Sequence, residues 1–158
     1  MARRSDDKIV LLVDDDTAVR QMLARALAFE AFVVVEAANG LEALEQLRRG
    51  CGAGVIVLDL RMPVMDGWAF RRAQRADPKI AKTPVVVLSG ADVHRFAELE
   101  ALAAFEKPVR ISDLAVRLHQ VFEDAEPRPR PRQPPVTQPP HTGGGRCSWR
   151  LIASPWPT

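Results

Sequence analysis

The amino-acid sequence predicts an α/β fold, with a doubly wound, five-stranded parallel sheet in the order 2-1-3-4-5 and helices on both of its faces. Short apolar runs alternate with amphipathic stretches over residues 8–122, which is the pattern of repeated β-α-β units. The runs are continuously apolar, as expected of strands that are covered on both faces. They comprise residues 9–13, 32–35, 55–58, 85–88 and, more weakly, 103–105.

Two helices are predicted from apolar side chains that recur with the period of an α-helix. The stripe of the first comprises Val19, Met22, Leu23, Ala26 and Leu27. The stripe of the second comprises Leu41, Leu44 and Leu47. Asn39 is a good N-cap for the second helix, and Gly50 is a natural left-handed terminator.

Three further helices complete the alternation. One begins at the cap Asp66, carries Trp68 and Phe70, and ends before Pro78. Between the fourth and fifth strands there is room only for a short helix, which we expect over residues 93–102. The last helix begins at Ser112 and buries Leu114, Leu118, Val121 and Phe122.

The composition changes abruptly after this helix. We expect one domain over residues 7–124 and a disordered tail over residues 125–158, because alternating proline forbids both a helix and a central strand. Such a tail can serve as a linker or as a ligand for proline-reading domains, but an inert basic tail is the favoured interpretation. It is too short to supply a helix-turn-helix, so no DNA-binding module is expected.

The charge and the hydropathy of the sequence limit the classes of protein to which the chain can belong. The net charge is +2, but residues 125–158 contain five Arg and one Glu, so the preceding residues carry about −2 and do not suggest a nucleic-acid binder. The two cysteines, Cys51 and Cys147, have no metal-binding spacing. No apolar run approaches the ~20 residues that span a bilayer. We therefore expect a cytoplasmic protein without a membrane segment.

Polar residues follow the predicted strands at the points where each strand ends. Asp14, Asp15 and Asp16 follow the first strand, Asp59 follows the third, Ser89 the fourth and Lys107 the fifth. Ligands of parallel α/β sheets bind beyond the carboxyl ends of the strands, so the order 2-1-3-4-5 brings these residues together. Each alone has an ordinary structural explanation, such as a helix cap for Asp16.

Carboxylates that share one crevice require a counter-charge. Two unit charges ~4 Å apart repel by about 4 kcal/mol at an effective dielectric near 20. Mg²⁺ relieves such repulsion with oxygen ligands, and Asp15 and Asp59 are the candidate direct ligands. A carboxylate beside a metal also attacks phosphorus to form an aspartyl phosphate, for which Ser89 and Lys107 supply support.

The sequence resembles the receiver domains of bacterial response regulators over about residues 7–124. Four motifs carry the resemblance in the family's order: IVLLVDD, VLDLRMPVMDG, VVVLSG and FEKPV. The resemblance implies a flavodoxin-like fold and phosphorylation of Asp59 by a phosphohistidine donor, either a sensor histidine kinase or a histidine phosphotransfer protein. It further implies signalling through contacts with a downstream protein.

The resemblance also implies a role for each motif residue. Asp15 would bind Mg²⁺ directly, Asp14 mainly through water, and the backbone carbonyl of Arg61 would complete the metal site. Ser89 and Lys107 would each contact a phosphoryl oxygen, as would the amide of Gly90. A cis peptide bond is implied between Lys107 and Pro108.

Two departures from the family's pattern concern switching. Three residues before Lys107 the family places a Tyr or Phe that swings inward on phosphorylation, and this chain has Ala104. Phe105 is adjacent, but on a strand its side chain faces the opposite way. The span from Ser89 to Lys107 is also about one helical turn shorter than in chemotaxis-type receivers. We expect a smaller or different rearrangement.

Two other functions remain as alternatives. Haloacid-dehalogenase-type phosphatases place D-x-D after the first strand, which would make Asp14 the nucleophile. That interpretation leaves Asp59 and MPVMDG unexplained and finds no suitable acidic ligands after Lys107. The second alternative is a receiver-like binding module that is never phosphorylated.

Overall fold

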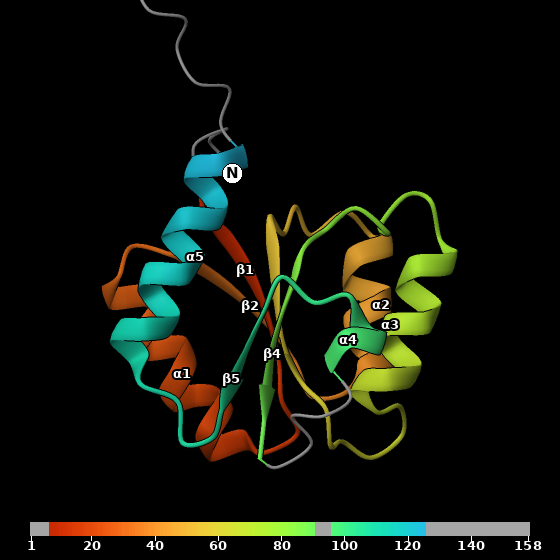
Figure 1. Ribbon diagram of the computed structural model, residues 1–158, viewed down its shortest axis with the longest axis horizontal. Helices are drawn as coiled ribbons and strands as arrows, with labels where there is room; N and C mark the ends of the chain where they lie inside the picture. Colours follow the sequence, from red (N-terminus) through yellow and green to blue (C-terminus); the bar gives the residue numbers. More distant parts are fainter. Residues whose placement is uncertain (1–6, 91–95, 126–158) are drawn as a thin grey trace, which may run out of the picture. The chain divides into compact units, whose positions relative to one another are not determined.

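A computed structural model describes residues 7–90 and 96–125. A parallel sheet lies at its centre (Figure 1). The five strands lie in the order β2-β1-β3-β4-β5, and every neighbouring pair is parallel. They are β1 (Ile9–Val13), β2 (Val33–Ala37), β3 (Val55–Asp59), β4 (Val85–Ser89) and β5 (Ala103–Glu106). The predicted fold class is thus confirmed, while the predicted tail over residues 125–158 lies, apart from Ala125 at the end of the last helix, outside the described residues.

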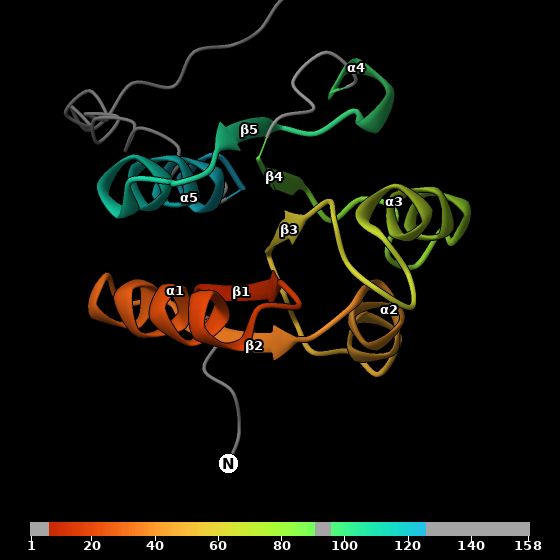
Figure 2. The same ribbon diagram turned by 90° about the horizontal axis from the view of Figure 1, so that it is seen from below.

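Helices cover both faces of the sheet. They are α1 (Thr17–Phe29), α2 (Gly40–Arg48), α3 (Gly67–Ala76), α4 (Phe96–Leu99) and α5 (Ile111–Ala125). Figure 2 shows α1 and α5 on one side of the strands and α2 and α3 on the other. In the described part of the chain, no helix is long and apolar enough to cross a membrane.

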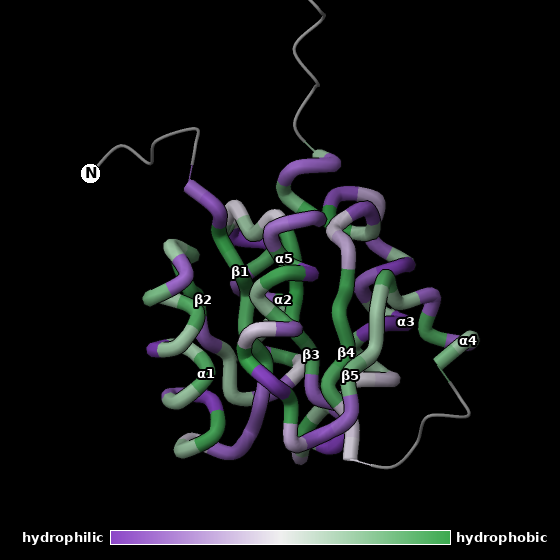
Figure 3. The backbone as a smooth tube through the Cα atoms, turned by 60° about the vertical axis from the view of Figure 1, so that its left-hand side comes forward, coloured by the Kyte–Doolittle hydropathy of each residue, from purple (hydrophilic) through white to green (hydrophobic). Residues whose placement is uncertain are grey.

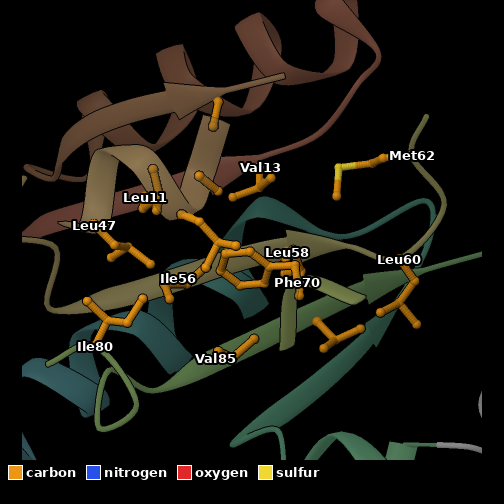
Figure 4. Close-up of a cluster of buried hydrophobic side chains, with 14 of the residues drawn as sticks. Leu11, Val13, Leu47, Ile56, Leu58, Leu60, Met62, Phe70, Ile80 and Val85 are labelled. Atoms are coloured by element: carbon orange, nitrogen blue, oxygen red, sulfur yellow. The ribbon is translucent and has the colours of Figure 1, made fainter. Parts of the chain in front are cut away.

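Alternate side chains of each strand enter two separate hydrophobic clusters. In β1, Val10 and Leu12 pack toward α1 and α5, whereas Leu11 and Val13 pack toward α2 and α3. Figure 4 shows the second cluster around Phe70, which is fully buried. Both faces of the central strands are therefore apolar, and β1 and β4 are correspondingly hydrophobic along the tube of Figure 3.

The two edge strands are less buried than their apolar runs predict. The three central strands β1, β3 and β4 are buried along their whole length, but β2 and β5 are partly exposed. β2 also begins one residue later and ends two residues later than predicted. Met22 and Leu41, expected on buried helix faces, are exposed, because each lies at the margin of an apolar stripe whose other leucines are buried.

The predicted N-caps of α2 and α3 are confirmed, whereas α5 begins at Ile111, one residue before the predicted Ser112. The side chain of Asn39 accepts a hydrogen bond from the amide of Glu42, and that of Asp66 accepts one from the amide of Ala69. Gly50, just beyond α2, has φ of 76°, the left-handed conformation that glycine adopts at low cost.

The segment between β4 and β5 is held by a buried arginine. The predicted helix over residues 93–102 falls partly outside the described residues, and the described helix α4 ends at Leu99. Arg71 of α3 donates from Nε to the carbonyl oxygen of Leu99 at 2.7 Å and from Nη2 to that of Glu100 at 3.0 Å. Its Nη1 donates to Gln74 Oε1 at 2.7 Å. α3 therefore fixes the C-terminal end of α4 through main-chain atoms.

Replacing Arg71 by Met should lower the free energy of unfolding by about 2–3 kcal/mol, because the carbonyl groups of the buried Leu99 and of Glu100 lose charge-assisted hydrogen bonds. Urea denaturation measures the loss. Arg72→Met is the matched control: Arg72 is the next residue on the same helix but is exposed, so its change should stay within about 0.5 kcal/mol. Equal effects of the two substitutions would show that the buried contacts of Arg71 contribute nothing to stability.

Candidate functional site

The carboxyl ends of the central strands bring the predicted site residues together. Asp14 directly follows β1, Asp59 is the last residue of β3, Ser89 is the last residue of β4, and Lys107 directly follows β5. Because β1, β3, β4 and β5 are consecutive in the sheet, these residues lie along one edge. The strand order alone therefore places them at one site.

Three carboxylates form the acidic part of the site. One oxygen each of Asp14, Asp15 and Asp59 lies within 4.8 Å of the others. Asp14 is only 1% exposed and Asp59 is 7% exposed, while Asp15 is open to solvent. The group thus combines two buried carboxylates with one accessible carboxylate.

Lys107 supplies the positive charge that faces this cluster. Its Nζ lies 2.9 Å from Asp14 Oδ2 and 3.3 Å from Asp59 Oδ2. Burial by itself lowers the pKa of Lys107, but the hydrogen bond to Asp14 and the charge of Asp59 outweigh it, so the pKa is raised overall. The ammonium group therefore stays charged beside both carboxylates.

The environment of Asp59 disfavours the ionised form of its carboxyl group. Burial raises its pKa above the usual value, and the neighbouring charge of Asp14 raises it further. Lys107 and the amide of Arg61, which donates to Asp59 Oδ1 at 3.4 Å, act in the opposite direction without cancelling the effect of burial. A second positive charge would stabilise this anion.

The loop after β3 keeps α3 close to Asp59. The amide of Gly67 donates to the carbonyl oxygen of Leu60 at 3.0 Å, at the first residue of α3. A Cβ atom at Gly67 would lie 2.7 Å from the carbonyl oxygen of Asp59 and 2.9 Å from the Cα of Leu60, both main-chain atoms that cannot give way. Glycine at this position of the MDG motif is therefore a steric requirement of the site.

The remaining predicted residues lie at the same edge. Ser89 is buried, and its carbonyl oxygen accepts a hydrogen bond from the amide of Lys107 at 2.9 Å. Gly90 is exposed, and a Cβ atom there would meet nothing within 4 Å. Arg61 is exposed two residues after Asp59. The implied cis peptide bond between Lys107 and Pro108 is present.

The donor set suits a hard divalent cation. It consists of carboxylate oxygens alone, and Mg²⁺ prefers one or two carboxylates together with water or phosphate oxygens. Soft metals, which select sulfur ligands, find no thiol among these residues. The exposed position of Asp15 leaves a route by which a hydrated ion can enter.

Comparison with known proteins identifies the family. Residues 10–119 match the family model described as "Response regulator receiver domain". The chain belongs to this family. The pocket of Asp14, Asp59 and Lys107 therefore lies in a receiver domain of the kind found in two-component systems.

Curated relatives extend beyond the part that this chain matches. The chain is 33% identical over 132 residues to the response regulator MprA of Mycobacterium sp. (strain KMS), a match covering 81% of this chain and 56% of that protein. It is 36% identical over 154 residues to protein-glutamate methylesterase/protein-glutamine glutaminase 1 of Paramagnetospirillum magneticum, covering 85% of this chain and 40% of that enzyme. The chain therefore spans about half the length of the curated relatives that it matches.

Solved receiver structures share the fold over nearly their whole length. The Francisella response regulator 1452 receiver domain has a TM-score of 0.69 and 25% identity, covering 76% of this chain and all of that one (100%). The chemotaxis response regulator CheY4 of Vibrio cholerae has a TM-score of 0.66 and 30% identity, covering 73% and 98%. The similarity thus includes a chemotaxis-type receiver.

Sequence reasoning missed one residue of this receiver site. No role for Arg20 followed from the sequence, but its guanidinium group donates to the main-chain carbonyl oxygen of Asp14. A cation in the first turn of a helix opposes the helix dipole, so its position was a signal that it has a specific partner. The departure at Ala104 is also visible: Ala104 is exposed, while Phe105 packs on the side of α1 and α5.

Removing the charge of Asp59 should stabilise the metal-free protein. We expect Asp59→Asn to raise the free energy of unfolding by roughly 1–2 kcal/mol in a chelator at neutral pH, because the buried charge and its repulsion by Asp14 disappear. The folded pKa of Asp59 lies above the unfolded value, so the wild type loses stability as pH rises through that folded pKa. The gain of the variant should therefore vanish in acid, where Asp59 is protonated in both states.

Thermal melting with a chelator and with Mg²⁺ tests this expectation. Mg²⁺ should raise the melting temperature of the wild type and leave that of Asp59→Asn nearly unchanged. Asp66→Asn is the control, because Asp66 lies outside the pocket and Asn is an equally good helix cap. A metal-free Asp59→Asn variant less stable than the wild type would refute the electrostatic account of this pocket.

Proposed function

We propose that this receiver accepts a phosphoryl group on Asp59 from a phosphohistidine donor, with Mg²⁺ bound beside it. The donor is a sensor histidine kinase or a histidine phosphotransfer protein. The observation that carries the proposal is the position of Asp59, a buried carboxylate 3.3 Å from the ammonium group of Lys107 and within 4.8 Å of two further aspartates. A nucleophile, a cation and an oxygen-rich metal site thus occupy one crevice.

Asp14, Asp15 and Asp59 would hold the ion, together with the backbone carbonyl of Arg61. The structure supports different roles for the two consecutive aspartates. Asp15 is accessible and suits direct ligation, whereas both oxygens of Asp14 already accept hydrogen bonds, from the amide of Asp16 at 2.9 Å and from Lys107 at 2.9 Å. Asp14 would then act mainly through water. When bound, Mg²⁺ supplies positive charge to the phosphoryl oxygens during transfer.

The transfer forms one bond and breaks another. A carboxylate oxygen of Asp59 attacks phosphorus, and the phosphorus–nitrogen bond of the donor histidine breaks with its electron pair remaining on the imidazole nitrogen. Lys107 then pairs with a phosphoryl oxygen, while the hydroxyl of Ser89 and the amide of Gly90 donate to the others. Water later attacks the same phosphorus and releases Asp59, so the domain catalyses its own loss of phosphate.

The negative charge of the phosphoryl group explains why Lys107 would change its contacts when Asp59 is phosphorylated. Without phosphate it lies between Asp14 and Asp59, and a phosphoryl dianion on Asp59 gives it a more strongly charged partner at the same place. The contacts of Lys107 and Ser89 with the new group would bias a two-state equilibrium at α4, β5 and α5. Output would pass through protein contacts at this surface. With Ala104 in place of the usual aromatic residue, we expect a smaller rearrangement than in chemotaxis-type receivers.

The family match favours this function over a phosphatase with Asp14 as nucleophile. Asp14 is also only 1% exposed and both of its carboxylate oxygens are engaged, which leaves it poorly placed to attack a substrate. A receiver-like module that is never phosphorylated remains the alternative to be tested.

Incubation with acetyl phosphate and Mg²⁺, followed by mass spectrometry of the intact protein and its peptides, distinguishes these functions. We expect one phosphoryl group on Asp59, no labelling of Asp59→Asn, and labelling of the control Asp66→Asn at the wild-type level. A group on Asp14 would instead indicate the phosphatase. Absence of labelling, together with absence of a beryllofluoride complex, would leave the binding module and refute the proposal.

A further inference from the structure

Arg20 connects the acidic pocket to the neighbouring strand. From α1, its Nη1 donates to the main-chain carbonyl oxygen of Asp14 at 2.7 Å, and its Nε donates to Glu36 Oε2 of β2 at 3.1 Å. The Arg20 side chain is only 14% exposed. A guanidinium group is planar and holds its donors in a rigid fork, so two contacts fix its orientation.

The carbonyl group that Arg20 holds belongs to the peptide unit between Asp14 and Asp15. This unit is planar, so fixing its oxygen also fixes the amide nitrogen of Asp15 and limits the direction in which that side chain leaves the backbone. The other polar atoms of Asp14 are also engaged: its amide donates to Ala37 at 3.2 Å, and its carboxylate accepts from Asp16 and Lys107. Arg20 thus completes the set of contacts that orient both aspartates.

We infer that Arg20 is a positioning residue of the acidic pocket: by holding the peptide unit between Asp14 and Asp15, it preorganises their carboxylates for a divalent cation. The inference rests on the proposed function, because it assigns Arg20 a role in the metal site of that function. Partners that orient metal ligands without touching the metal commonly contribute 10–100-fold to affinity. Arg20 occupies such a position relative to both Asp14 and Asp15.

Electrostatics and positioning predict opposite results for this residue. Removing the positive charge of Arg20, which contacts the main chain of Asp14, should, by charge alone, strengthen the binding of Mg²⁺. Loss of the hydrogen bond to Asp14 should weaken it, because the two carboxylates then sample more orientations. The sign of the change in Mg²⁺ affinity therefore separates the two effects.

The test is a calorimetric Mg²⁺ titration of the whole chain with three substitutions. Arg20→Gln should raise the dissociation constant about tenfold. Arg25→Gln removes the same charge from an exposed position of the same helix and should change it less than about twofold. Glu36→Gln removes the ion pair but keeps the contact with Asp14, and should change it less than about threefold.

Labelling with acetyl phosphate supplies a second readout. At saturating Mg²⁺ the Arg20→Gln variant should be labelled at close to the wild-type rate, whereas at limiting Mg²⁺ it should be slower by about the factor lost in affinity. A purely structural role predicts that Arg20→Gln and Glu36→Gln lose similar thermal stability and keep wild-type Mg²⁺ affinity. That result, or tighter Mg²⁺ binding by Arg20→Gln, would overturn the inference.

Further outcomes are also decisive. If Arg20→Gln does not fold, Arg20→Lys takes its place, because a lysine keeps the positive charge but cannot make both contacts of the guanidinium group. We expect Arg20→Lys to lose about threefold in Mg²⁺ affinity, and an unchanged affinity would overturn the inference. If the wild type itself neither binds Mg²⁺ nor becomes labelled, the proposed function fails and this inference with it. A wild type that binds Mg²⁺ while Arg20→Gln binds it equally well refutes the role of Arg20 alone.

Discussion

The site depends on an imbalance of charge that the sheet imposes. Consecutive parallel strands bring Asp14, Asp15 and Asp59 within 4.8 Å, and one ammonium group, that of Lys107, lies between two of them. Three negative charges against one positive charge form a pocket that favours any further cation. Burial adds to this effect, because it raises the pKa of Asp59 and makes its anion costly without such a partner. The proposed metal binding and phosphoryl transfer would both use this imbalance.

The fold class was predictable because the central strands carry an unusually strong signal. β1, β3 and β4 are apolar at every position before their final polar residues, and only a sheet covered on both faces buries such runs. The ends of β2 were not predictable from hydropathy, because an edge strand is covered less completely and Glu36 is tolerated within it. The exposure of Met22 and Leu41 was not predictable either. The helical period identifies the apolar face of a helix, but it does not show how much of that face the sheet covers.

The pocket residues were predictable because each interrupts an apolar run at a strand end. Asp14, Asp59, Ser89 and Lys107 needed only the strand order to be brought together. Arg20 and Arg71 were missed because their partners are main-chain carbonyl groups. Every residue has such a group, so the residue types at positions 14, 99 and 100 do not indicate these contacts. Long-range hydrogen bonds to the backbone are thus the part of this site that the sequence conceals.

The contacts of Arg71 bear on how a change at Asp59 can spread. The C-terminal end of α4 is tied to α3 through Leu99 and Glu100, and Arg75 adds an ion pair to the Glu100 carboxylate at 2.6 Å. α3 itself begins against the main chain of Asp59, through Gly67. Among the described residues, one continuous chain of contacts therefore joins β3, the strand of the proposed phosphoacceptor Asp59, to α4 by way of α3. This connection does not involve Ala104, so it would not depend on an aromatic residue at that position.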